Sequence, residues 1–180
     1  MKSVQKKDFP VHRARELLEP TPTVLVSSLH KGKTNIMAMG WYTILEFSPS
    51  LIGCMITSAN HSFDMIRKSR ECVINIPTQD MAKTVIRIGN SDGDEIDKFE
   101  AFGLTSAKSS KVSAPRIKEC YAHFECKLVD TKMINKYNFF IFEIVKAQKA
   151  VTPKYPKTLH YRGFGDFMLS GKSLHLESPQ

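Results

Sequence analysis

The chain has 180 residues, a length that suits a single domain able to bury most of its apolar surface. Hydrophobic residues make up 42% and charged residues 24% of the sequence, which excludes an intrinsically disordered chain. No run approaches the roughly 18 apolar residues of a membrane helix, and the basic N-terminal stretch lacks the apolar segment of a secretory signal. We therefore expect a cytoplasmic protein without a membrane partner.

The net charge of +8 is compatible with a nucleic-acid partner. However, Lys and Arg are spread along the chain, and the densest basic run, residues 108–118, has the composition of a loop. No helix-turn-helix, zinc-finger or RNA-binding aromatic motif accompanies the charge. A phosphate-bearing small ligand or an anionic cosubstrate explains the excess equally well, so we expect no nucleic-acid partner.

The cysteines occur singly, without a CxxC pair or a Cys/His cluster at zinc spacing. In a reducing cytosol, such residues are free thiols packed in strands. The sequence therefore predicts no metal site. The four residues are Cys54, Cys72, Cys120 and Cys126.

Strand-like segments dominate the first half of the chain. Residues 21–29 are rich in β-branched side chains and lead through a His-Lys-Gly-Lys turn into a predicted return arm at 34–47. Gly40 interrupts this arm, and a glycine inside a strand often marks a bulge or the close approach of a ligand. The short apolar runs at 51–57 and 72–77 are typical of buried strands.

Helices are predicted from apolar spacing and from their end signals. The second of them has Ser, Asn and Ser at its start and positive charge at its end, which predicts hydroxyl N-caps. Gly89 is the expected C-cap of the third. The four predicted helical segments are residues 12–18, 63–69, 79–89 and a short turn at 96–102.

Two long strands at 121–134 and 138–151 follow a polar, glycine-punctuated region, and a last strand is predicted at 166–169. Short strands in pairs with two or three helices favour one mainly β domain over 1–180, built as a small antiparallel barrel with helical decorations. Its core occupies about residues 20–150, and 151–180 form a C-terminal extension.

The segment Thr57-Ser58-Ala59-Asn60-His61-Ser62 begins the second helix. A helix start has free backbone N–H groups and the positive end of the helix dipole, and hydroxyls add donors; these are the elements of a phosphate site. A plain N-cap is the simpler interpretation. Three hydroxyls, an amide and an imidazole within six residues nevertheless exceed what capping requires.

The stretch from Asn35 to Pro77 resembles the FMN-binding core of the flavin reductase-like family, and is closest to its flavoredoxin-type branch. The shared pattern is Asn and small residues before Trp, a strand ending in Ser/Thr, a hydroxyl-rich turn into a helix, and a strand ending Asn-hydrophobic-Pro. The likeness covers about residues 20–150. It implies a split β-barrel of six strands in a Greek-key layout, assembled as a homodimer with FMN near the subunit interface.

The resemblance also implies which residues bind FMN. Those along the edge of the isoalloxazine ring are Asn35, Met37, Ala38 and Met39. Those at the phosphate and ribityl chain are Thr57, Ser58, His61 and Ser62. Three further correspondences are Trp41, Asn75 and Lys98. For Trp41, a core aromatic is an equally open interpretation.

One loop departs from the family pattern. Many reductases of this family carry Gly-Asp-His before the strand that begins near residue 139, where this chain has Lys136, Tyr137 and Asn138. An asparagine cannot carry a proton charge in the physiological range. Use of NAD(P)H as the electron donor is therefore in question, whereas the segment implied to bind FMN is complete.

Two functions of different classes stay open. The first is an FMN-binding oxidoreductase that passes electrons through its flavin, either as an NAD(P)H-dependent flavin reductase or as a flavoredoxin-like carrier with a redox partner protein. The second is a non-catalytic flavin-binding or storage module. No catalytic residue is assigned, because hydride transfer to a flavin needs only orientation and electrostatics from the protein and no general base. The sequence has no GxGxxG dinucleotide motif and no GxSxG nucleophile motif.

Overall fold

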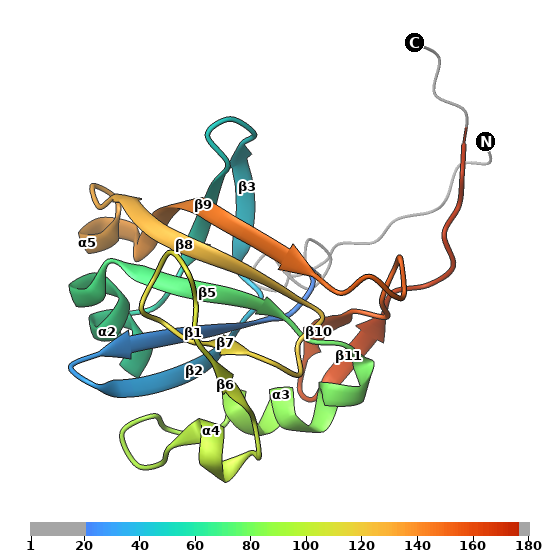
Figure 1. The fold of residues 1–180 in the computed structure, drawn as a ribbon, viewed down its shortest axis with the longest axis horizontal. Coiled ribbons are helices and arrows are strands. Elements are labelled where there is room, and N and C mark those ends of the chain that lie inside the picture. The colour runs from blue at the N-terminus through green and yellow to red at the C-terminus, as the bar shows by residue number, and fades with distance from the viewer. Residues whose placement is uncertain (1–20, 177–180) are drawn as a thin grey trace, which may run out of the picture.

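The computed structural model describes residues 21–176, which form an antiparallel β-barrel decorated with helices (Figure 1). The helix predicted at 12–18 lies outside the described residues. Within them, seven strands make one sheet in the order β2-β1-β5-β8-β9-β4-β3, and every neighbouring pair is antiparallel. These strands are β1 (Val24–His30), β2 (Lys33–Met39), β3 (Tyr42–Glu46), β4 (Leu51–Met55), β5 (Glu71–Ile76), β8 (Ala122–Asp130) and β9 (Phe139–Lys149).

Strands β2 and β3 are the two edges of this sheet although they follow each other in the chain. The continuous arm predicted at 34–47 is therefore wrong: the chain leaves the sheet at Gly40 and Trp41, and β3 pairs with β4 instead of β1. Since a two-residue link joins the opposite edges, the sheet has to curl until they approach each other. This arrangement is a split barrel, and the predicted fold class is confirmed.

The predicted hairpin between β1 and β2 is confirmed. Lys31 and Gly32, the two turn residues, both have positive φ, at 49° and 77°. That combination belongs to the tight turns whose twist matches the twist of the paired strands. The strands predicted at 51–57 and 72–77 are present as β4 and β5, each within two residues of the expected bounds.

Residues 21–176 contain five helical segments beside the sheet. Strand β8 ends at Asp130, so the strand predicted to run to 134 is wrong; a helical turn closes the β8–β9 connection. Gly89 is the last helical residue of its helix, and Asn90 is the C-cap, which corrects the predicted glycine cap. The segments are α2 (His61–Ser69), the 3-10 turn η2 (Gln79–Met81), α3 (Ala82–Gly89), α4 (Lys98–Ala101) and α5 (Ile134–Tyr137).

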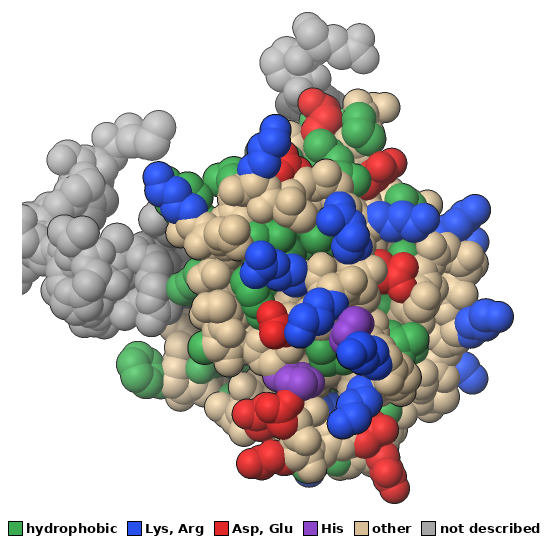
Figure 2. All heavy atoms as spheres, turned by 90° about the vertical axis from the view of Figure 1, so that its left-hand side faces the viewer, with side chains coloured by type: hydrophobic (Ala, Val, Ile, Leu, Met, Phe, Trp, Pro, Cys, Tyr) green, Lys and Arg blue, Asp and Glu red, His purple; other side chains and the backbone are tan. Residues whose placement is uncertain are grey.

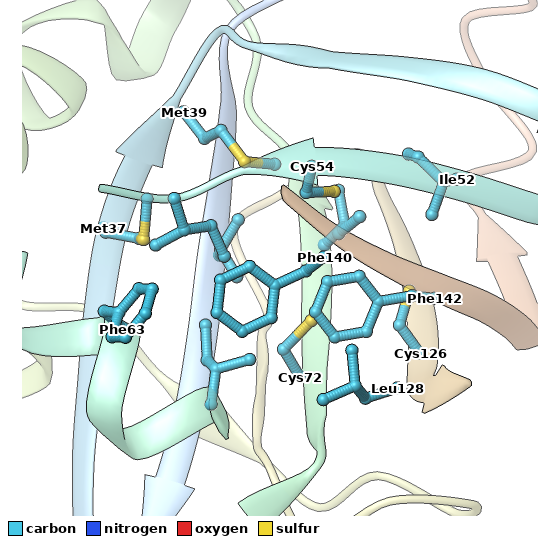
Figure 3. Packing of buried hydrophobic residues seen from close by; sticks show 14 of the residues in the cluster. Met37, Met39, Ile52, Cys54, Phe63, Cys72, Cys126, Leu128, Phe140 and Phe142 are labelled. Atoms are coloured by element: carbon cyan, nitrogen blue, oxygen red, sulfur yellow. The ribbon is translucent and has the colours of Figure 1, made fainter. Parts of the chain in front are cut away.

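Sulfur-containing and aromatic side chains fill the barrel interior (Figure 3). Met37 and Met39 enter it from β2, and Phe140 and Phe142 from β9. Phe63 of α2 closes one end and meets the Phe140 ring edge-to-face, with 5.2 Å between the ring centroids. Each large aromatic ring removed from water contributes about 1.5–3 kcal/mol, so this cluster anchors α2 against the sheet.

A second core lies on the opposite face of β1 and β2, beneath α3. Side chains alternate along β1, so Val26 points into the barrel while Leu25 points toward α3. Leu25 and Ile36 pack against Val85 and Ile88 of α3. The β1–β2 hairpin is thus covered on both faces, which explains why the consecutive residues 24–26 of β1 and 36–39 of β2 are all apolar.

The C-terminal extension folds back as a hairpin beside α3 (Figure 1). Strand β11 (Asp166–Leu169) matches the predicted last strand, but its partner β10 (Leu159–Gly163) was not predicted. Leu159 is buried in the second core, and its carbonyl accepts a hydrogen bond of 2.6 Å from the Thr23 N–H. A further small sheet of two-residue strands, β6 (Ser106–Ala107) and β7 (Arg116–Ile117), lies in the region expected to be loops.

All four cysteines are free and buried, as predicted. Cys54, Cys72 and Cys126 lie in strands, whereas Cys120 lies in the turn before β8. Burial raises the pKa of the Cys54 and Cys120 thiols well above the ordinary value, which keeps both neutral.

The charged surface has no single basic stripe on the face drawn in Figure 2. Lys and Arg side chains are scattered over it, with acidic side chains and histidines among them. Such an even distribution differs from the clustered Lys and Arg of a nucleic-acid footprint. In the part of the chain that the structure describes, no helix has the length and apolar character needed to span a bilayer.

Candidate functional site

Two adjoining cavities lie beside strand β2. We name the first, of about 330 Å³, the polar cleft; it is bordered by β2, the start of α2, Lys98 and the loop at 90–93. The second, of about 240 Å³, is the aromatic chamber, bordered by the end of β2, by α3 and by the β10–β11 hairpin. Ala38, Gly89 and Asn90 line both, so one molecule can extend from the cleft into the chamber.

Asn35 of β2 brings a buried amide to the polar cleft. Its Nδ2 donates a hydrogen bond of 2.9 Å to the Ser62 hydroxyl, while its Oδ1 has no hydrogen-bond partner among the described residues. Gly93 lies directly against this amide, and a Cβ at that position would overlap the amide atoms. Asn35 and Gly93 thus pack closely against each other where both border the cleft.

The start of α2 is organised by an amide and not by the predicted hydroxyls. Asn60 is the N-cap, and its Oδ1 accepts a hydrogen bond of 2.9 Å from the Ser62 N–H. Thr57 and Ser58 are exposed and do not line the cleft, and the Thr57 hydroxyl accepts from the Ala59 N–H at 3.4 Å. Their contact with a phosphate, like that of Ser62, stays a prediction.

His61 is the predicted phosphate residue of this turn that does line the cleft. Its Nδ1 pairs with the carboxylate of Asp94, which follows the cleft loop. This pair joins the first turn of α2 to the loop after α3. The first turn of α2, with the positive end of its dipole, thus borders a cleft whose two sides are joined by the His61–Asp94 contact.

Lys98 places an almost fully buried ammonium group in the cleft, with 4% of the residue exposed. Its Nζ donates to the carbonyls of Ile88 at 3.1 Å and Ser91 at 2.8 Å. Burial lowers the pKa of Lys98, and the charge of nearby Asp92 opposes this shift. No carboxylate of the described residues lies within 4 Å of the Lys98 Nζ, so its charge lacks the close anion that a buried cation normally requires.

The aromatic chamber combines two predicted residues with two that the sequence did not reveal. Met39 and Trp41 line it from the end of β2, as the resemblance implied for residues near the flavin. Tyr161 and Phe167 line it from the hairpin, with 5.1 Å between their ring centroids. Trp41 is 48% exposed, so it lies at a cavity wall and the surface instead of in the core.

Asn75 lies outside both cavities. It is fully buried in β5, where its Nδ2 donates to the Leu25 carbonyl at 3.0 Å. Its Oδ1 accepts from the Ile117 N–H at 3.0 Å and faces His123 Nδ1 at the same distance. These bonds fasten β7 to the barrel wall, which is a structural role.

Asn138 ends helix α5 in the left-handed region, with φ of 54°. Its carbonyl accepts a hydrogen bond of 2.9 Å from the Ile56 N–H, immediately before Thr57. The loop that departs from the family pattern thus contacts the strand end that leads into α2. Asn138 does not line either cavity.

Comparison with known proteins gives consistent matches. A family model described as the flavin reductase like domain matches residues 17–166. An uncharacterized protein of Pyrococcus abyssi is 35% identical over 129 residues, which are 72% of this chain and 74% of that protein. An uncharacterized protein of Archaeoglobus fulgidus is 35% identical over 130 residues, with 72% and 73% covered.

Solved structures share the fold over nearly the whole chain. The FMN-binding domain of a flavin reductases-like enzyme from Shewanella baltica has a TM-score of 0.80 and 26% identity, with 94% of this chain and 96% of that chain covered. Flavoredoxin of Desulfovibrio vulgaris has a TM-score of 0.79 and 23% identity, with 98% and 96% covered.

Proposed function

Because the chain belongs to the flavin reductase-like domain family, we propose that it binds FMN beside β2, with the phosphate end in the polar cleft. The observation that carries this proposal is the buried ammonium of Lys98, which has no anionic partner among the described residues. A phosphate supplies the missing charge, and the positive end of α2 and the His61 imidazole favour the same ligand.

The cavities also fit the rest of such a molecule. FMN is anionic at one end and flat and largely apolar at the other, and the cleft and chamber differ in the same way. Asn35 and Gly93 both line the cleft, and any side chain at Gly93 would collide with the Asn35 amide. The FMN-binding domain from Shewanella baltica is 26% identical to this chain and covers 94% of it.

The proposed activity is electron transfer through the bound flavin, which supplies reversible one- and two-electron chemistry when present. The residues of this chain bind and orient it and exclude water around it. We propose NAD(P)H or a redox protein as the electron donor. The four buried free thiols suit a reducing compartment, so we place the activity in the cytoplasm.

Titration with two flavins tests this proposal. FMN added to the flavin-free protein is expected to bind at about one molecule per chain, with riboflavin, which lacks the phosphate, binding more weakly. Lys98→Met keeps the length of the side chain but removes its charge, and is expected to lower the affinity for FMN by about 10- to 100-fold. The affinity of the same variant for riboflavin is expected to stay nearly unchanged. Absence of FMN binding to the wild-type protein contradicts the proposal.

We also propose that the protein is a homodimer formed around β3. This edge strand is exposed over most of its length, and its apolar side chains face solvent. Phe47, in the following turn, is 89% exposed. A partner subunit would cover both the apolar surface and the open sheet edge, which a monomer leaves exposed. The exposed apolar residues of this region are Trp41, Ile44, Leu45 and Phe47.

Light scattering tests the dimer. The expected mass is about twice the chain mass of 20.4 kDa. Ile44→Lys is expected to shift the protein to monomer, because it buries an unpaired charge in the proposed interface. Val129→Lys is the matched control, since Val129 is a comparably exposed apolar residue on β8, three strands from β3 in the sheet. A wild-type monomer at micromolar concentration contradicts the dimer.

A further inference from the structure

The inner face of the C-terminal hairpin carries two aromatic side chains. Leu159 of β10 is buried in the second core, and side chains alternate along a strand, so Tyr161 lies on the same face two residues later. Phe167 of β11 is directly opposite Tyr161 in the hairpin register and packs against the second core. Both residues therefore lie on the face turned toward α3, and both line the aromatic chamber (Figure 1).

The hairpin is held in this position at both of its ends. At its base, the Leu159 carbonyl accepts a hydrogen bond of 2.6 Å from the Thr23 N–H, immediately before β1. At its turn, Gly165 lies next to α3, where a Cβ on the glycine would be 3.9 Å from the end of the Ile86 side chain. The two aromatic residues thus belong to a wall that is anchored to the barrel and to α3.

The Tyr161 side chain is accessible to a ligand. The residue is 41% exposed, and its ring centroid lies 5.1 Å from that of Phe167, with an angle of 52° between the ring planes. The Tyr161 hydroxyl accepts a long hydrogen bond of 3.4 Å from the Gly165 N–H. A bond of this length contributes little, so the aromatic ring is the main group that Tyr161 brings to the chamber.

The other walls of the chamber favour a flat, uncharged group. Trp41 adds a further aromatic residue from the β2–β3 link, and Val85 and Ile86 add aliphatic side chains from α3. None of the described side chains that line the chamber is charged. Its volume of about 240 Å³ is below the roughly 300–1,000 Å³ of pockets for whole drug-sized ligands, so it suits one part of a larger molecule.

We propose that the C-terminal hairpin completes the ring site of the flavin, with the isoalloxazine ring packed against the Tyr161–Phe167 pair in the aromatic chamber. The inference rests on the proposed binding of FMN and adds specific partners at the end of the molecule far from the phosphate. Aromatic rings attract each other beyond the effect of the area they bury, so this pair selects a flat ring over an aliphatic group of similar size.

The test compares three flavins that share the ring: FMN, riboflavin, and lumiflavin, which has neither the ribityl chain nor the phosphate. Tyr161→Leu keeps an apolar side chain but removes the aromatic ring, and is expected to lower the affinity for all three by about two- to tenfold. Tyr161→Phe, which keeps the ring, is expected to retain these affinities. Tyr155→Leu makes the same change at a 68% exposed residue that lines neither cavity, and is the control. Equilibrium dialysis of the flavin-free protein measures each affinity.

The outcomes separate this inference from the proposed function. If FMN binds but Tyr161→Leu lowers the affinities no more than Tyr155→Leu does, the role of the hairpin is overturned while FMN binding stands. A loss confined to FMN also overturns it, because all three flavins share the ring. If the wild-type protein binds no FMN, both proposals fail.

A second measurement uses the wild-type protein and needs no variant to fold. Nuclear Overhauser effects are expected between protons of bound lumiflavin and the ring protons of Tyr161 and Phe167, which isotope labelling of the aromatic residues resolves. These effects report proximity of the ring to the hairpin directly. Their absence in protein saturated with lumiflavin overturns the proposal.

Discussion

The side-chain amide of Asn35 donates a hydrogen bond of 2.9 Å to the hydroxyl of Ser62, and both residues are buried. This bond joins β2 to the first turn of α2, the two elements that border the polar cleft. The N–H of Ser62 is occupied by the Asn60 cap. Ser62 therefore links two walls of the cleft. This role differs from that of a helix cap and from that of a phosphate ligand.

Removal of this link is expected to affect the whole cleft. Ser62→Ala leaves a buried amide donor of Asn35 unpaired, which lowers the free energy of unfolding by about 1–3 kcal/mol. We expect the affinities for FMN and for riboflavin to fall by the same factor, because the variant changes the cleft wall and not a contact with the phosphate. Urea denaturation and flavin titration measure the two effects. Loss of FMN affinity alone would instead make Ser62 a direct phosphate ligand, the role that Ser58→Ala probes at the exposed neighbouring position.

The close contact between Gly93 and Asn35 gives a second prediction. Gly93→Ala places a methyl group where the Asn35 amide lies, so either the amide or the loop has to move. Overpacking of this kind costs about 1–3 kcal/mol, and we expect weaker FMN binding together with a lower unfolding midpoint. Gly171→Ala is the matched control, because no atom lies within 4 Å of a Cβ there. Equal behaviour of the two variants would show that the cleft loop tolerates displacement.

Lys98 predicts how FMN affinity depends on pH. Burial lowers the pKa of its ammonium group below the ordinary 10.5, although Asp92 opposes the shift. Only the protonated form attracts a phosphate, so FMN affinity is retained below the lowered pKa and falls as the pH rises through it. Since the phosphate of FMN is fully ionised well above pH 6, its charge stays constant in a titration above about pH 8.

Two controls accompany this pH titration. Riboflavin has no phosphate, so its affinity for the wild-type protein is expected to stay flat over the same range. Lys98→Met is expected to bind FMN weakly at every pH, without the alkaline decline. A decline that persists in the variant would assign the titration to another group.

Much of the fold follows from the sequence because local patterns agree with it. The alternation in β1, the positive-φ turn at Lys31 and Gly32, and the buried runs of β4 and β5 are set by neighbouring residues. The break between β2 and β3 is not local. It depends on which strands each segment pairs with: β2 pairs with β1, and β3 pairs with β4. Gly40 indicates an irregularity in the strand but does not reveal the change of partner.

The candidate site was predictable in part. The resemblance indicated five residues that the structure brings together at one cleft: Asn35, Met37, Ala38, His61 and Lys98. Asn75 was also implied by the resemblance but lies buried elsewhere. The chamber walls could not be foreseen, because Tyr161 and Phe167 belong to a segment whose proline-rich surroundings suggested no strand pairing.

The last prediction concerns Asn138 and the electron donor. The left-handed conformation of this residue is one that asparagine and histidine both adopt more often than most residues, so Asn138→His can preserve the turn that ends α5. The carbonyl of Asn138 is bonded to Ile56, which keeps this position beside the segment that leads into α2. If a histidine here assists nicotinamide binding or hydride transfer, the wild-type protein is a slow NAD(P)H oxidase, since general acid–base assistance typically contributes about 10²–10⁴-fold.

Anaerobic stopped-flow reduction of the bound flavin by NADH and NADPH measures this effect. Asn138→His is expected to raise the rate by at least about tenfold, whereas Asn138→Gly, which also permits the left-handed turn, is expected to leave it unchanged. Tyr137 is 54% exposed beside this position, and its ring can hinder the nicotinamide. If the single variant is slow, Tyr137→Asp with Asn138→His tests that obstruction. A wild-type protein already reduced at about ten per second or faster, an ordinary enzymatic rate, would show that Asn138 does not impair the reaction and that NAD(P)H is the donor.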